Sequence, residues 1–161
     1  AYLDAEWGAR FSESALLLAL VEAGHVGRKS GQGFYAYDDG ETGVVDALIE
    51  RLRDTSQLVE AKSAFGVVER TMALLLNEAF LCVEEEIASV ADIDLACKTG
   101  LGMQVRWEGE RAPMGPLEYA DRVGLDVLLA RFEGLATELG RRFRPAEVLR
   151  EKAEARERFT R

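Results

Sequence analysis

The sequence predicts an all-α fold, and three observations support this prediction. Apolar residues recur every three or four positions over long stretches, most clearly from Phe65 to Ile87. No segment shows the sustained alternation of apolar and polar residues that is typical of a half-buried strand. The 161 residues are 48% hydrophobic and 30% charged and include only three prolines, which is the composition of a globular domain with a substantial core.

Each predicted helix has apolar residues at helical spacing, and most have a start or stop signal. The predicted ranges are 14–23, 44–61, 65–87, 89–100, 116–124, 125–139 and 145–159, the last one increasingly charged and frayed. Glycines follow or end four of them, at positions 24, 100, 124 and 140, where a helix C-terminus prefers them. Ser89 and Asp92 have the spacing of a capping box, and Pro116 stands where a missing backbone donor costs little. The helix at 65–87 is expected at the centre, and residues 101–113 are expected to form a loop.

The stretch from Gly27 to Tyr37 reads GRKSGQGFYAY, and it is too rich in glycine and aromatic residues for a helix or a plain strand. We expect a tight turn in which Gly27, Gly31 and Gly33 are free to take positive φ values. Phe34, with the two tyrosines that follow it, is expected to pack this turn against a neighbouring body.

Charge and composition exclude several classes of function. The formal net charge is −9, so a nucleic acid would be repelled over most of the surface. No apolar run is long enough to span a bilayer, and the first residues do not resemble a signal peptide. Cys82 and Cys97 are expected to be free thiols, as in a reducing compartment. The default expectation is a cytoplasmic protein, although the absence of an initiator Met is compatible with an excerpted chain.

The residues alone reveal no catalytic centre. The Gly-x-Gly-x-x-Gly fingerprint of a dinucleotide fold is missing, and residues 27–33 resemble a phosphate loop only in composition. His25 is the only histidine, lies at a helix end, and has no adjacent Ser or Cys nucleophile. Asp92 and Asp94 point in different directions on a helix, so we expect capping and surface charge rather than an acid–base pair.

Two further features of the chain are open to more than one interpretation. Met103, Gln104 and Trp107 either line a ligand groove or pack their own loop. The pattern that begins at Arg10-Phe11 returns at Arg142-Phe143, with similar residues at the same spacing behind each. If this echo is a repeat, the chain holds the tail of one unit followed by a nearly complete second unit.

Several motifs occur here in the order found in one family. They are the turn GRKSGQGFYAY, Leu76-Asn77-Glu78-Ala79, residues 87–94, Gly100-Leu-Gly102 and residues 114–126. Together they resemble the C-terminal domain of L-3-hydroxyacyl-CoA dehydrogenases, a helical bundle similar to the 6-phosphogluconate dehydrogenase C-terminal-like domain. Residues 1–43 then resemble the tail of a first copy with a linker, and residues 44–161 a second copy with its leading helix. Tandem copies of this kind are known in multifunctional β-oxidation enzymes.

The resemblance implies an enzyme that oxidises L-3-hydroxyacyl-CoA to 3-ketoacyl-CoA with NAD. The family's catalytic His-Glu pair and NAD fingerprint lie in a Rossmann domain, so we expect no catalytic, cofactor or metal residue here and no activity of the isolated chain. The family places an asparagine directly after a pair of aliphatic residues, where this chain has Glu69 after Val67-Val68. This departure suggests a structural duplicate, whose substrate-cleft candidates are Glu69, Met114, Gly115 and Pro116.

The same resemblance implies partners and a role for the glycine-rich turn. The expected partners are the Rossmann NAD domain of the same enzyme, an acyl-CoA substrate and a second copy of the protein. The turn residues Gly27, Lys29, Gly31, Gly33 and Phe34 are expected to form the joint between the two copies. The alternative hypothesis is a stand-alone helical interaction or acyl-CoA-binding protein without dehydrogenase activity.

Overall fold

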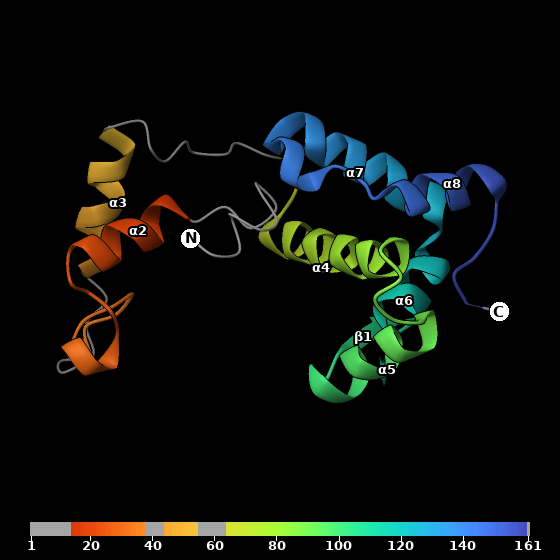
Figure 1. Ribbon diagram of the computed structural model, residues 1–161, viewed down its shortest axis with the longest axis horizontal. Helices are drawn as coiled ribbons and strands as arrows, with labels where there is room; N and C mark the ends of the chain where they lie inside the picture. Colours follow the sequence, from red (N-terminus) through yellow and green to blue (C-terminus); the bar gives the residue numbers. More distant parts are fainter. Residues whose placement is uncertain (1–13, 38–43, 55–63, 161) are drawn as a thin grey trace. The chain divides into compact units, whose positions relative to one another are not determined.

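The computed structural model describes residues 14–37, 44–54 and 64–160 (Figure 1). Contacts divide the chain into two units, Ala1–Lys62 and Ser63–Arg161, and each is a separate body. The described residues are mostly helical, with one two-stranded sheet. The all-α prediction is therefore confirmed, with a small strand content. The division after Lys62 differs from the predicted boundary between residues 43 and 44, and the assignment of residues 1–43 to a first copy stays a prediction.

The first unit contains helices α2 (Ala15–Glu22) and α3 (Val44–Asp54) and a short 3-10 turn, η2 (Arg28–Ser30). In the described part of this unit, a hydrophobic cluster joins the two helices through Ala19 and Leu20 of α2 and Leu48 and Leu52 of α3. The helix predicted at 44–61 is present to Asp54, and its remaining residues lie outside the described part. Burial of these four apolar side chains stabilises the contact between the two helices.

The glycine-rich turn of the first unit forms as predicted, but its glycines serve different purposes. Gly27 (φ 110°) and Gly31 (φ 73°) take positive φ values. Gly33 does not; instead, a Cβ there would lie 2.9 Å from Cα of Gly27. The Ser30 hydroxyl accepts from the Val26 N–H at 3.1 Å and lies 2.9 and 2.7 Å from the carbonyl oxygens of residues 27 and 32. Close backbone approach is therefore what requires glycine at position 33.

The aromatic and cationic residues of this turn lie on its surface. Phe34 is 46% exposed, and Lys29, in η2, is also exposed. Tyr35 and Tyr37 contact each other edge to face, with ring centroids 6.4 Å apart. The Arg28 guanidinium lies 5.3 Å from the Tyr37 ring centroid, a cation–π distance. Whether another body covers these side chains stays a prediction.

The second unit is built around α4 (Val67–Glu84), which confirms the predicted central helix. The other elements are α5 (Val90–Gly100), α6 (Pro116–Val123), α7 (Leu125–Leu139), η3 (Arg141–Phe143) and α8 (Glu147–Ala155). Phe80 of α4 is fully buried and lies at the centre of the core. Its ring meets Phe132 edge to face at 6.2 Å and stacks on Phe159 at 5.1 Å.

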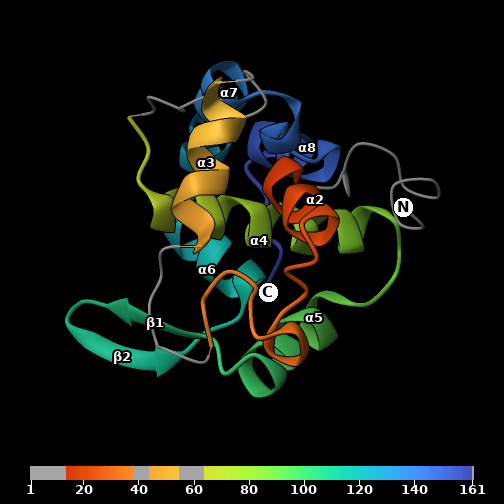
Figure 2. The same ribbon diagram turned by 90° about the vertical axis from the view of Figure 1, so that its left-hand side faces the viewer.

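The expected loop at 101–113 is wrong, because part of it is a β-hairpin. Strands β1 (Gln104–Trp107) and β2 (Glu110–Pro113) pair antiparallel. The two residues between them, Glu108 (φ 50°) and Gly109 (φ 89°), both have positive φ, as the tight turn of a two-residue hairpin requires. Figure 2 shows the hairpin projecting from the helices of this unit.

The predicted frayed end of the last helix is also wrong. Helix α8 ends at Ala155, and Arg156 turns the chain through a left-handed conformation (φ 55°). The carboxylate of Asp121 then accepts the backbone N–H groups of Phe159 at 2.9 Å and Thr160 at 2.7 Å, and the Thr160 hydroxyl at 2.6 Å. The end of the unit is thus bound to α6, with Phe159 in the core.

Candidate functional site

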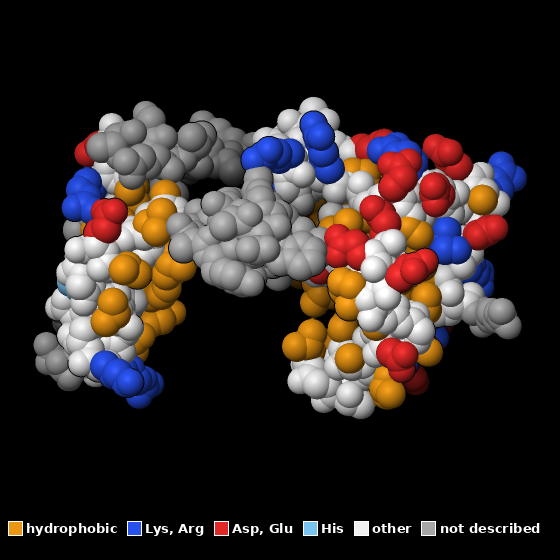
Figure 3. Space-filling model, in the orientation of Figure 1, with side chains coloured by type: hydrophobic (Ala, Val, Ile, Leu, Met, Phe, Trp, Pro, Cys, Tyr) orange, Lys and Arg blue, Asp and Glu red, His pale blue; other side chains and the backbone are white. Residues whose placement is uncertain are grey.

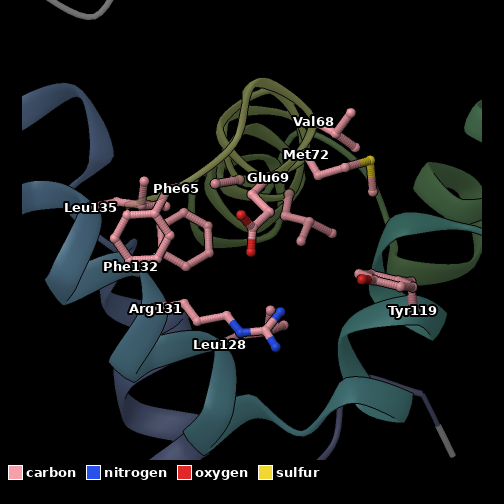
Figure 4. Close-up of a pocket in the computed structure, with 11 residues that line it drawn as sticks. Phe65, Val68, Glu69, Met72, Tyr119, Leu128, Arg131, Phe132 and Leu135 are labelled. Atoms are coloured by element: carbon pink, nitrogen blue, oxygen red, sulfur yellow. The ribbon is translucent and has the colours of Figure 1, made fainter. Parts of the chain in front are cut away.

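A pocket of about 130 Å³ lies in the second unit, between the first half of α4 and helices α6 and α7 (Figure 4). Most of its walls are apolar. The lining residues are Phe65, Val68, Glu69, Met72, Ala73, Leu76, Tyr119, Leu128, Arg131, Phe132 and Leu135. The volume is close to that of an engineered cavity of about 150 Å³ that binds benzene. A short acyl segment or a single ring is therefore the largest apolar group this pocket can enclose.

Two charged side chains from different helices face the pocket. Figure 4 shows the carboxylate of Glu69, on α4, and the guanidinium of Arg131, on α7, directed toward the same space. One oxygen of Glu69 accepts the Gly66 N–H at 2.9 Å, which caps α4 and fixes the side chain. Arg131 forms no ion pair with any described residue. The pocket thus combines the Glu69 carboxylate as a hydrogen-bond acceptor, the Arg131 guanidinium as a donor, and apolar walls. This combination suits a small ligand with a polar group.

The candidates Met114, Gly115 and Pro116 do not line this pocket. They are buried and lead into α6, where Pro116 is the first helical residue, as predicted. The carboxylate of Asp94, on α5, accepts the N–H groups of Leu117 at 2.8 Å and Glu118 at 3.1 Å. A Cβ at position 115 would overlap that carboxylate. These three residues therefore form a structural junction between α5 and α6.

The expectation that Asp94 is a surface charge is wrong, since its side chain is only 5% exposed. It acts as a capping group for another helix, which the sequence spacing around it does not reveal. Burial raises the pKa of Asp94 above its ordinary value of 3.8, and the backbone bonds from residues 117 and 118 and the charge of Lys98 offset part of that rise. At the start of α5 the capping residue is Ser89: its hydroxyl accepts the N–H of Asp92 at 3.2 Å and donates to the Asp92 carboxylate at 2.6 Å.

The motif Leu76-Asn77-Glu78-Ala79 has a structural role that sequence reasoning missed. The Asn77 side chain is 6% exposed; its Nδ2 donates to the carbonyl of Arg144 at 2.9 Å, and its Oδ1 accepts the N–H of Ala146 at 3.0 Å. A buried amide with both functions satisfied holds the segment before α8 in place. A lone asparagine in an apolar helical pattern is the signal that could have indicated this role.

A second hollow, of about 480 Å³, lies behind the hairpin. It is lined by residues of the hairpin, of the segment that follows it and of α6: Trp107, Glu108, Glu110, Ala112, Pro113, Met114, Glu118 and Arg122. Of the three residues considered for a ligand groove, Trp107 lines this hollow and Met103 and Gln104 do not; whether a ligand binds here stays a prediction. The N–H of Met103 instead donates to the carbonyl of Cys97 at 3.0 Å. This contact ties the base of the hairpin to α5.

The described residues contain no group of three His, Cys, Asp or Glu side chains arranged to hold a metal ion. Within the same ranges, none of the helices has the length and hydropathy needed to cross a bilayer. His25 lies after α2 in the first unit, where its N–H donates to the carbonyl of Leu20 at 2.8 Å.

Fold and site together define a helical domain with a small, largely apolar binding pocket and no nucleophile–base pair in its lining. The sequence model described as "3-hydroxyacyl-CoA dehydrogenase, C-terminal domain" matches residues 66–160. The chain belongs to the family of 3-hydroxyacyl-CoA dehydrogenase C-terminal domains.

Solved structures agree with this assignment. The (S)-3-hydroxybutyryl-CoA dehydrogenase from Ralstonia eutropha is 33% identical, with a TM-score of 0.50, over 73% of this chain and 40% of that one. The 3-hydroxybutyryl-CoA dehydrogenase from Escherichia coli K12 has a TM-score of 0.67 at 22% identity, over 95% of this chain and 47% of that one. The second likeness concerns the fold alone. This chain spans less than half the length of each protein.

Proposed function

We propose that this chain serves an NAD-dependent L-3-hydroxyacyl-CoA dehydrogenase as its substrate-cleft and association domain, without catalytic activity of its own. The observation that carries the proposal is the family match over residues 66–160. The 33% identity to a (S)-3-hydroxybutyryl-CoA dehydrogenase supports it. In this proposal hydride transfer to NAD takes place in a Rossmann domain elsewhere in the same enzyme, and the protein acts in the cytoplasm.

Within this proposal, Glu69 and the junction residues contribute in different ways. Glu69 faces the apolar pocket (Figure 4), so it would contact an acyl group directly. Met114, Gly115 and Pro116 would act through the position of α6, which carries Tyr119 on the pocket wall. A carboxylate offers only hydrogen-bond acceptors, whereas an asparagine amide offers a donor as well, and this difference distinguishes the pocket from one with the family's asparagine. A supporting role in the cleft fits this chemistry better than a role in catalysis.

Exposed apolar side chains support the association role. In the first unit Leu17, Leu18 and Val21 of α2 are 43–55% exposed, and in the second unit Val67 and Val68 are 69% and 75% exposed. Figure 3 shows hydrophobic side chains on the surface of both units. Contiguous apolar surface of this kind is typical of sites that pack against another domain or subunit. The proposed partners are the NAD domain of the same enzyme and a second copy of the whole enzyme.

Enzyme assays test the proposal. The purified 161-residue chain should form no NADH from 3-hydroxybutyryl-CoA and NAD, whereas the protein encoded by the complete reading frame should form it. NADH production by the isolated chain would contradict the proposal. The matched control is the complete protein with its catalytic histidine replaced, which should be inactive while the helical part remains folded.

The competing hypothesis is a stand-alone helical interaction or acyl-CoA-binding protein. The coding DNA upstream of Ala1 distinguishes the two. An in-frame Rossmann domain supports the dehydrogenase, whereas a start codon directly before Ala1 supports the stand-alone protein.

A further inference from the structure

The β1–β2 hairpin separates its charges between its two faces. In its register Arg106 lies opposite Arg111, and Trp107 lies opposite Glu110. Side chains alternate between faces along a strand, and directly opposed residues share a face. Both arginines therefore stand on one face and Glu110 on the other. Glu108 belongs to the turn between the strands and, like Glu110, lines the hollow beside the hairpin.

The two arginines have no counter-ion among the described residues. Both are exposed, and neither forms an ion pair with a described carboxylate. The Cβ atoms of opposed residues are about 4.5–5.5 Å apart, and like charges at such a pair destabilise a hairpin. The repulsion between Arg106 and Arg111 is thus not offset by any carboxylate of the described residues.

An anion placed between the arginines would remove the repulsion and engage two planar donor forks. Guanidinium groups match the oxygens of a phosphate in bidentate pairs. A phosphate has enough oxygens to serve both forks at once, whereas one carboxylate has only two. Gln104 occupies the same face, two residues before Arg106, and adds an amide donor. The base of the hairpin is tied to α5 through Met103, so these donors stand on an anchored element.

We propose that the hairpin face formed by Gln104, Arg106 and Arg111 binds a phosphate group of a nucleotide-type ligand. This inference rests on the proposed function and deepens it, because a CoA ester carries both a diphosphate and a 3′-phosphomonoester. The hairpin would hold the nucleotide end of the substrate, at a place distinct from the apolar pocket lined by Glu69.

Calorimetric titration of the 161-residue chain with CoA, dephospho-CoA and inorganic pyrophosphate tests this proposal. CoA should bind saturably, and Arg106→Gln or Arg111→Gln should each weaken binding about tenfold or more, as loss of a hydrogen bond between charged groups predicts. Arg141→Gln and Arg156→Gln remove the same charge from exposed positions outside the hairpin and are the matched controls. They should change the affinity by less than about twofold.

The three probes identify the group that is bound. Equal binding of CoA and dephospho-CoA assigns the diphosphate, and loss of binding with dephospho-CoA assigns the 3′-phosphomonoester; both results support the proposal. Equal affinities of the wild type and the hairpin variants would overturn it, as would absence of binding by both CoA and pyrophosphate. If the complete enzyme is active and its affinity for CoA is unchanged by Arg106→Gln and Arg111→Gln, the hairpin site is refuted and the proposed function is not.

Discussion

Replacing Asp94 by alanine should destabilise the second unit by about 2.5–4.5 kcal/mol, a magnitude that follows from its two backbone partners. Leu117 is fully buried, so its N–H would lose its acceptor without gaining water, at a cost of about 1–3 kcal/mol. The N–H of Glu118 is partly buried, and its bond to a charged acceptor contributes about 1.5 kcal/mol or more. The two losses act at the same helix terminus, where a negative charge is favourable.

Urea unfolding followed by the fluorescence of Trp107 measures this effect in the second unit. Trp7 is the only other tryptophan, and Trp7→Phe in every variant leaves a single reporter. With a slope of about 2 kcal/mol per molar urea, the midpoint should fall by about 1.2–2.2 M without a change in slope. Asp94→Asn is the control: it keeps one acceptor oxygen, so it should cost about 1–2 kcal/mol. An alanine variant within about 0.5 kcal/mol of the wild type, or an asparagine variant as unstable as alanine, would refute the reasoning.

Four further outcomes are expected. As the pH falls from above the raised pKa of Asp94 to 3.8, the wild type should gain stability relative to Asp94→Asn, because the folded state binds the proton more tightly; a constant difference in urea titrations across that window would contradict this. Asn77→Ala should cost about 2–4 kcal/mol by the same unfolding assay, since two buried bonds are lost, and an effect below about 1 kcal/mol would be inconsistent with them. Gly33→Ala should disorder the turn in amide NMR spectra and leave α4 unchanged, whereas Gly100→Ala, where a Cβ meets nothing within 4 Å, should be tolerated; a normal turn in Gly33→Ala disproves the close approach. Partial burial, together with the charge of Asp94 and the neighbouring Cys82, raises the pKa of Cys97. In a Cys82→Ser background iodoacetamide should therefore label Cys97 more slowly at neutral pH than it labels free cysteine, and labelling at the free rate would contradict the raised pKa.

The helices could be predicted from the sequence because their signals are local. The capping box at Ser89, the proline at position 116 and the glycines at 124 and 140 mark ends that the structure places within a residue or two. The hairpin was missed for a local reason too. Its strands have four residues each, too few to show sustained alternation, and its turn is Glu-Gly rather than the more recognisable Asn-Gly or Asp-Gly.

The parts that could not be predicted depend on contacts between distant segments. Asp94 is separated from its partner Leu117 by 23 residues, so its own helix gives no sign that it caps another one. The pocket has the same character. The family resemblance indicated Glu69, but Arg131 faces the same space only because the fold brings α4 and α7 to opposite walls of the pocket (Figure 4).

The bond between Asp121 and the N–H of Phe159 closes a loop of 38 residues without a covalent link. Closing such a loop costs conformational entropy, and the bonds that offset this cost can form only when residues 121 and 159 are both present. A nascent chain emerging from the ribosome has therefore already made α4, α6 and α7 before the aromatic ring that completes their shared core exists. The second unit therefore cannot complete its core packing until Phe159 has been synthesised.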